Sequence, residues 1–206
     1  MDSYYTIEKS GAAEFKDRGS RFLAYAFPLT SKEAFKTILQ NIKSEHSKAT
    51  HHCFAYRLGF DKTAFRSSDD GEPSGTAGHP ILGQIDSREL TDTLIIVVRY
   101  FGGTLLGVPG LINAYKTAAS YVLQVTPVVQ KQVEVFYALQ FDYTTMNEVM
   151  TTIKLFNCSV ISREMQLFCL MTVGIAKRNL DQTLNRFREI QNLELHEMKG
   201  KALLNQ

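Results

Sequence analysis

Residues 94–103 have the sequence LIIVVRYFGG, and this stretch decides how the first half of the chain folds. The apolar, largely β-branched run at residues 94–98 predicts a strand that is buried on both faces and ends at Arg99. A glycine-rich segment (GGTLLGVPG, residues 102–110) follows, and apolar positions in residues 111–123 predict a helix that stops at Thr126 and Pro127. The segment therefore predicts a buried strand that leads through a glycine-rich loop into a helix.

Upstream of this segment, alternating or apolar patterns predict strands at residues 4–8, 20–29 and 52–58. Residues 31–45 predict an amphipathic helix, with Ser31 or Thr30 and then Glu33 supplying capping chemistry. In the strand at 52–58, Cys53 and Ala55 share a face with Arg57, and the even-numbered residues occupy the other face. Residues 59–80 are polar and rich in small residues, which favours a long functional or disordered loop, and residues 81–90 predict a short helix.

The second half of the chain shows a different order of elements. Strands are predicted at residues 133–141, 159–164, 167–176 and 193–198, with helices at 144–156 and 180–190. This βαββαβ order is typical of a ferredoxin-like domain. With a linker at residues 126–130, the sequence predicts an α+β protein of two domains, residues 1–128 and 129–206.

Composition excludes several classes of protein. The 206 residues carry 23 basic and 21 acidic side chains, so the net charge of +2 cannot by itself drive nucleic-acid binding. Hydrophobic residues make up 44%, which predicts a folded core. No stretch is long and apolar enough for a membrane span and no secretory signal is recognised, so we expect a cytoplasmic protein. The three cysteines are widely spaced, which argues against a disulfide framework and against a structural zinc site.

An acidic segment, SSDDGEPSGTAG at residues 67–78, is the first candidate site. Its three carboxylates, Asp69, Asp70 and Glu72, could hold a divalent cation or orient basic groups. The alternative is a tight turn, because Asp-Gly and Glu-Pro form turns and Ser74 or Thr76 could cap the next helix. No calcium-loop spacing is present, and the turn is the favoured interpretation.

The glycine-rich segment after Arg99 is the second candidate. Glycines allow close backbone approach and a helix start attracts anions, so phosphate or an RNA backbone could bind there with Arg99 as the charge partner. The segment matches neither the P-loop nor the dinucleotide-binding pattern. Anion binding and a purely structural turn therefore both remain open.

The sequence His51-His52-Cys53 suggests a thiol protease or a zinc site, but adjacent strand residues point to opposite faces. Cys53 is better explained as a buried core residue. In the second domain, basic residues cluster at positions 177, 178, 186 and 188 and aromatic residues lie on strands, yet the consensus of an RNA-recognition sheet is missing. Most of these aromatic residues are expected in the core.

Three segments in order resemble the IMPACT/YigZ family: residues 49–57 (ATHHCFAYR), residues 68–78 (SDDGEPSGTAG) and residues 98–103 (VRYFGG), followed by Gly107, Ala114 and Tyr115. The resemblance implies an amino-terminal domain like the second domain of a ribosomal small-subunit protein and a tail like domain V of elongation factor G. It also implies a role in translation, because eukaryotic relatives regulate initiation, although through an additional domain whose partner does not carry over. Asn113 stands where an arginine is common in the family.

From these features we expect a non-enzymatic regulator associated with translation, which binds RNA, tRNA or the ribosome and needs no cofactor. The acidic and glycine-rich segments are expected to meet in one groove, with Arg57 and Arg99 on phosphates and Asp70 and Glu72 orienting Arg99 or a metal. The alternatives are a phosphotransferase or hydrolase that binds a nucleotide or phosphate, and a protein-interaction module without a small ligand. No catalytic residue or metal ligand is assigned. The residues expected to contact an anion or RNA are His52, Arg57, Asp70, Glu72, Ser74, Thr76, Arg99, Tyr100, Gly102, Gly103, Gly107 and Gly110.

Overall fold

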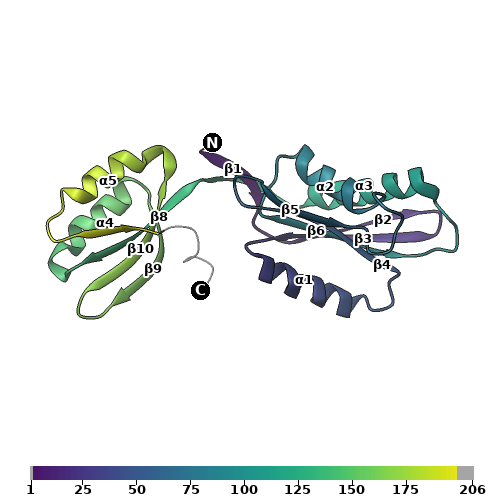
Figure 1. Ribbon diagram of the computed structural model, residues 1–206, viewed down its shortest axis with the longest axis horizontal. Helices are drawn as coiled ribbons and strands as arrows, with labels where there is room; N and C mark the ends of the chain where they lie inside the picture. Colours follow the sequence, from purple (N-terminus) through teal and green to yellow (C-terminus); the bar gives the residue numbers. More distant parts are fainter. Residues whose placement is uncertain (1, 199–206) are drawn as a thin grey trace. The chain divides into compact units, whose positions relative to one another are not determined.

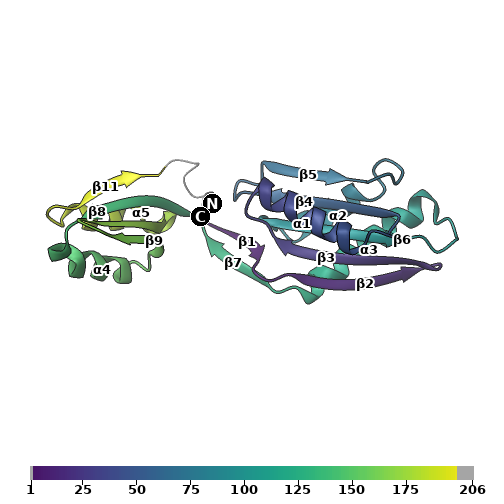
Figure 2. The same cartoon turned by 90° about the horizontal axis from the view of Figure 1, so that it is seen from below.

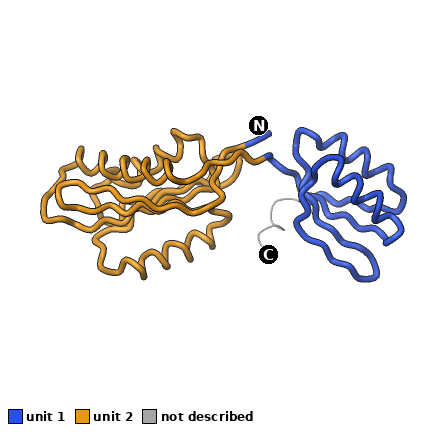
Figure 3. The backbone as a smooth tube through the Cα atoms, turned by 180° about the vertical axis from the view of Figure 1, so that it is seen from behind, with its two compact units in different colours: residues 1–3, 132–206 blue, residues 4–131 orange. Residues whose placement is uncertain are grey.

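The computed structural model describes residues 2–198, and these form two compact units (Figure 3). One unit spans residues 4–131, and the other contains residues from 132 onward together with the first residues of the chain. The α+β class with two domains is confirmed. The sequence-based division after residue 128 stays a prediction.

The unit of residues 4–131 contains a five-stranded antiparallel sheet in the order β2-β3-β6-β4-β5 (Figure 1). Its strands are β2 (Gly11–Asp17), β3 (Ser20–Pro28), β4 (His51–Leu58), β5 (Ala64–Ser68) and β6 (Thr93–Tyr100). β6 occupies the centre, and its residues up to Arg99 are buried. The expectation of a strand covered on both faces is therefore confirmed.

Helices cover both faces of this sheet. On one face, α2 (Gly78–Ser87) and α3 (Gly107–Val125) pack on a core that includes Cys53, Ala55 and Val97. On the other face, α1 (Lys32–Glu45) packs over Phe54 and neighbouring apolar residues. The Ser31 side chain caps α1 by accepting a hydrogen bond from the amide of Ala34, a contact that typically contributes about 1 kcal/mol.

The second unit has the predicted βαββαβ order. Its elements are β8 (Glu134–Phe141), α4 (Met146–Leu155), β9 (Ser159–Met165), β10 (Cys169–Ala176), α5 (Leu180–Arg188) and β11 (Glu194–Glu197), with short 3-10 turns η1 (Tyr143–Thr145) and η2 (Lys177–Asn179). The sheet order is β11-β8-β10-β9 and every pair is antiparallel. Both helices and one sheet face enclose a core around Leu139, Val173 and Phe187, which gives a ferredoxin-like domain.

Three strands were not expected from the sequence. β2 forms an edge strand beside β3, and β5 occupies part of the polar segment that we expected to be a loop. Part of the expected linker is also a strand, because β7 (Val128–Gln132) pairs with β1 (Ser3–Ile7) in a separate two-stranded sheet (Figure 2). Backbone pairing stabilises these segments, with the neighbouring strand for β2 and β5 and with a distant strand for β7, and their own apolar patterns are too weak to reveal it.

No helix within residues 2–198 has the length and apolar character needed to cross a membrane.

Candidate functional site

A buried polar network lies at the end of β6, where this strand meets the acidic segment. The Arg99 guanidinium donates to Glu72 Oε1 at 2.6 Å, and the Tyr115 hydroxyl donates to the same oxygen at 2.7 Å. The exposed fractions of the Glu72 and Arg99 side chains are only 3% and 6%. The Cys53 thiol follows in the network and lies 3.4 Å from the Tyr115 hydroxyl. The network therefore ties β4, β6, α3 and the acidic segment together.

Burial controls the ionisation of the two neutral groups in this network. It raises the pKa of the Cys53 thiol and that of the Tyr115 hydroxyl far above their ordinary values. A thiol with a raised pKa is a poor nucleophile, because the thiolate is the reactive form. Cys53 is fully buried, so its expected core position is confirmed.

The three carboxylates of the acidic segment point to three different places. Asp69 accepts hydrogen bonds from the amides of Gly75, Ala77 and Gly78 at 2.8 to 3.0 Å, which fixes the start of α2. Burial acts to raise the pKa of Asp69, but these three amides outweigh it and lower that pKa below its usual value. Among residues 2–198, no group of three or more potential metal ligands lies close enough to hold an ion.

Asp70 has a separate structural role and does not contact Arg99. Its backbone is left-handed, at φ 43°, and its carboxylate accepts from the His52 amide at 2.7 Å and from Lys43 at 3.2 Å. Of these two carboxylates only Glu72 contacts Arg99, so the expectation that Asp70 orients Arg99 is wrong. Asp70 instead shapes the turn that places Glu72.

A hollow of about 340 Å³ opens next to the buried network, and we call it the loop hollow. Its polar part consists of His51, Glu72 and Arg99. Its remaining walls are almost entirely apolar and belong to the acidic segment, the loop after β6 and the first turns of α3. These residues are Pro73, Phe101, Leu105, Leu106, Gly107, Val108 and Leu111.

Several apolar side chains at the loop hollow face solvent. The exposed fractions are 45% for Phe101, 83% for Leu105 and 52% for Val108. The helix that begins here, α3, has no side-chain cap at its N-terminus within the described structure. An exposed apolar rim of this kind is a common feature of binding surfaces.

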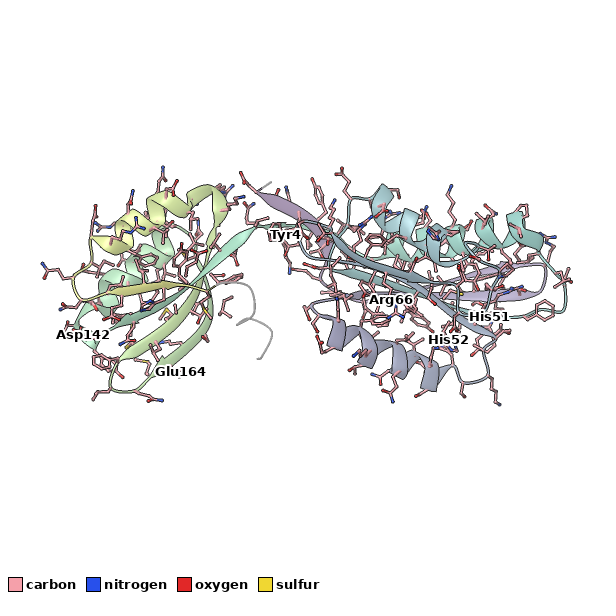
Figure 4. All side chains as sticks on the ribbon, viewed as in Figure 1. Tyr4, His51, His52, Arg66, Asp142 and Glu164 are labelled. Atoms are coloured by element: carbon pink, nitrogen blue, oxygen red, sulfur yellow. The ribbon has the colours of Figure 1, made fainter. Side chains whose placement is uncertain are left out.

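The two adjacent histidines, labelled in Figure 4, lie on opposite faces of β4. Because His51 pairs with Arg99 in the register of β4 and β6, its ring lies on the side of Glu72, at 3.9 Å from Nε2 to Oε1. The His52 ring lies on the side of α1, where Nε2 is 3.2 Å from the His46 carbonyl. Burial lowers the pKa of His52. His52 was therefore the wrong histidine for the expected groove.

Tyr100 is also turned away from the loop hollow. Its hydroxyl lies 2.9 Å from His46 Nδ1, and the Tyr25 hydroxyl lies 2.8 Å from His46 Nε2. These contacts lie on the α1 face of the sheet, because Tyr100 packs against the core on that side. Alternation along β6 separates Tyr100 from Arg99, so the expectation that both contact one ligand is wrong.

Arg57 lies at the opposite end of the sheet from Arg99. Its register partner is Thr93, six positions from the His51–Arg99 pair, which corresponds to roughly 20 Å along the strand. The Arg57 guanidinium is bound to the Asp86 carboxylate and to the Lys62 carbonyl. Arg57 therefore does not join the expected groove.

Arg99 itself is not free to bind phosphate, because its guanidinium contacts Glu72 and, at 3.4 Å, the Ser20 hydroxyl. It also lies 5.5 Å from the ring centroids of Phe22 and Phe101. The arginine with an accessible side chain at this site is Arg18, which was not expected from the sequence. Its side chain is 51% exposed, lies 3.6 Å from the Asp17 carboxylate and donates to the Leu106 carbonyl at 3.3 Å.

The expected glycines serve the protein's own backbone. A Cβ on Gly102 would lie 1.9 Å from the carbonyl carbon of Gly19, so this glycine permits contact between two loops and not contact with a ligand. A Cβ on Gly110 would lie 2.8 Å from the Arg18 guanidinium. Gly103 and Gly107 have φ of 85° and 70°, which glycine adopts readily.

The remaining two expected residues lie at the start of α2. Ser74 is exposed, while Thr76 is buried and donates from its hydroxyl to the Pro73 carbonyl at 2.7 Å. Neither caps the helix, since Asp69 fills that role. Sequence reasoning also left out Tyr115, Phe101 and Leu105. Their positions beside the glycine-rich segment could have indicated them only if the path of the loop had been known.

Comparison with known proteins agrees with this two-domain α+β architecture. Residues 18–123 match the family model described as the Impact N-terminal domain, and this range includes the whole network and the loop hollow. The chain belongs to the IMPACT family.

Relatives of similar length extend the match beyond this domain. An IMPACT family member of Haemophilus influenzae is 30% identical over 203 residues, covering 94% of this chain and 98% of its own. The family member YvyE of Bacillus subtilis is 37% identical over 149 residues, covering 72% of this chain and 69% of its own. A crystal structure titled as that of a hypothetical protein superposes with a TM-score of 0.74, at 27% identity, and covers 98% of this chain and 100% of its own.

Proposed function

We propose that this protein is a non-enzymatic regulator associated with translation, which binds RNA or the ribosome through the face of the amino-terminal unit that carries the loop hollow. Membership of the IMPACT family supports the link to translation, because the resemblance implies such a role for eukaryotic relatives. The geometry of the site supports binding more than catalysis.

The observation that carries the proposal is that the polar groups beneath the loop hollow are already hydrogen-bonded or held in an unreactive form. Glu72 is held by two donors, Asp69 is held by three amides, and burial raises the pKa of Cys53. Groups fixed in this way hold a loop in place, whereas a general base or nucleophile needs a free, reactive form. Above these fixed groups, an apolar rim faces solvent beside Arg18 and the start of α3. The partial positive charge at a helix start attracts phosphate.

The experiment is a salt-dependent binding titration of the full chain against ribosomal subunits, tRNA and single-stranded RNA. We expect binding that weakens as salt rises, because phosphate contacts release counterions. Arg18→Ala should lower the salt slope by about 1, the value for one lost phosphate contact. Lys36→Ala is the matched control, since Lys36 is an exposed cation on α1, on the opposite face of the sheet.

The rival function is an enzyme that binds a nucleotide or phosphate, and the uncapped start of α3 is the observation that favours it. A rise in melting temperature with nucleotide and magnesium, together with no binding to the three RNA-containing partners at low salt, would support the rival and refute our proposal.

A further inference from the structure

The loop hollow combines an apolar wall with two polar atoms that make no hydrogen bond within the described residues, although one of them, His51 Nε2, lies 3.9 Å from Glu72 Oε1. His51 Nδ1 lies 2.8 Å from the Asp70 carbonyl oxygen. A carbonyl oxygen can only accept, so Nδ1 carries the proton, and in the neutral ring Nε2 remains an acceptor. The exposed fraction of the His51 side chain is 18%, and the ring lines the hollow.

The second atom is Nε of Arg99, a residue that lines the same hollow. Arg99 is 5% exposed, and its two terminal nitrogens are bound to Glu72 and Ser20. Its Nε–H has no partner, and within residues 2–198 it is the one buried side-chain nitrogen or oxygen in that condition. Buried donors are normally satisfied, so this atom points to a missing acceptor.

We propose that the loop hollow binds one unstacked nucleobase, with the base edge toward His51 and Arg99 and the ring against Phe101. This inference rests on the proposed RNA binding and names the part of the RNA that the hollow takes. A base edge offers ring or exocyclic N–H donors and C=O acceptors, which are the groups that His51 Nε2 and Arg99 Nε–H require.

The polar and apolar groups of the hollow favour a base over an aliphatic side chain or a phosphate. An aliphatic side chain of a protein partner would bury His51 Nε2 and leave Arg99 Nε without an acceptor, which costs free energy. A phosphate inside the hollow would meet the Glu72 carboxylate, which already neutralises Arg99. A base is uncharged and has an apolar face, so it suits walls made of Phe101, Leu105 and Val108.

The phosphates of the same strand would then remain outside the hollow. Arg18 lies at its edge, in contact with the Leu106 carbonyl and beside Gly110. Base recognition within the hollow and phosphate contact at its rim therefore use different residues, and each can be removed separately.

The test uses the full chain and two fluorescent RNA 12-mers, one intact and one in which every base is replaced by an abasic sugar. We expect the intact strand to bind at least tenfold more tightly. Phe101→Ala should weaken binding of the intact strand by about 5- to 150-fold, the range for loss of one stacked base, and should leave the abasic strand unaffected. Phe101→Tyr should restore binding, because it keeps the ring.

The matched control is Phe65→Ala, because Phe65 is a similarly exposed phenylalanine on β5 outside the loop hollow. A second variant, His51→Leu, removes the acceptor but keeps the apolar bulk. Thermal melting of each variant verifies that it is folded.

Each outcome bears on one proposal or on both. Equal affinity for intact and abasic strands would overturn the base-binding proposal and leave RNA binding standing. Equal effects of Phe101→Ala and Phe65→Ala would also overturn it. Absence of binding to either strand at low salt, with no binding to ribosomal subunits, would overturn the proposed function as well. Free nucleosides at millimolar concentration, followed by chemical shifts of the His51 ring, test whether a base alone suffices; shifts confined to other histidines would count against the site.

Discussion

Glu72→Ala should destabilise the amino-terminal unit strongly, because it leaves a buried cation without its counter-ion. The carboxylate is 2.6 Å from the Arg99 guanidinium and 2.7 Å from the Tyr115 hydroxyl. Both charged side chains are at most 6% exposed, so water cannot replace the lost partner. Removing one partner of a buried pair typically costs about 3–5 kcal/mol, and total stabilities are about 5–15 kcal/mol.

At about 2–4 °C per kcal/mol for a chain of this size, that loss corresponds to a fall of roughly 6–20 °C in Tm. Urea unfolding and thermal melting of the full chain measure it. The control is Glu14→Ala, because Glu14 forms an exposed ion pair with Arg21 at 2.8 Å and should contribute little.

A double variant separates the ion pair from packing. Glu72→Leu with Arg99→Met removes both charges, so we expect it to be more stable than the sum of the single losses predicts. If Glu72→Ala costs no more than Glu14→Ala, or if the two single losses are strictly additive, the reasoning about a buried pair is refuted.

Three further predictions concern the backbone and the titrating groups. Asp69→Asn should lower stability at pH 7 by about 1.5–3 kcal/mol, because it weakens charge-assisted bonds to three amides. Folding lowers the pKa of Asp69, so the stabilisation by its carboxylate is present above the ordinary pKa near 4 and is lost as pH falls through the lower folded value. Urea unfolding should therefore give the parent and Asp69→Asn proteins the same stability in acid. Gly102→Ala should cost about 1–3 kcal/mol by thermal melting, because its Cβ would overlap the Gly19 backbone. Burial raises the pKa of Cys53, and raises that of Cys158 to about 11, so both should react slowly with a thiol reagent at pH 8 and rapidly in denaturant.

Each of these three predictions has a result that would contradict it. A constant difference between Asp69→Asn and the parent from pH 7 down to pH 2 would exclude the carboxylate charge as the cause. A Gly102→Ala protein with unchanged Tm would show that the two loops can separate at no cost. Rapid modification of Cys53 in the folded protein would contradict its burial.

Strands and helices were predictable from the sequence where the apolar pattern of a segment is strong. The apolar run at residues 94–98 indicated the central strand β6, and the alternation in residues 52–58 correctly separated Cys53 from Phe54. The βαββαβ order followed from the periodicity of each segment. β2 and β5 were missed because they are half-exposed edge strands, each paired with its neighbour in the chain, and their apolar alternation is weak. β7 was missed because its partner, β1, lies far away in the sequence.

The sequence predicted which segments form the candidate site, but not which side chains of those segments face it. The acidic and glycine-rich segments do meet, and Glu72 does pair with Arg99. The error over His52 arose because only the register of β4 against β6 decides which of two adjacent histidines faces Arg99. Arg57 was misplaced for a related reason, since antiparallel pairing places it at the far end of the sheet.

The most direct test of RNA binding at the loop hollow is photo-crosslinking of the full chain to single-stranded RNA that contains 4-thiouridine, followed by mass spectrometry of the digested protein. The account predicts crosslinks in the segment from Phe101 to Leu111, which lines the hollow, and their loss in Phe101→Ala but not in Phe65→Ala. Crosslinks confined to residues 132–198, or an RNA that leaves the 101–111 segment unmodified while binding tightly, would contradict it.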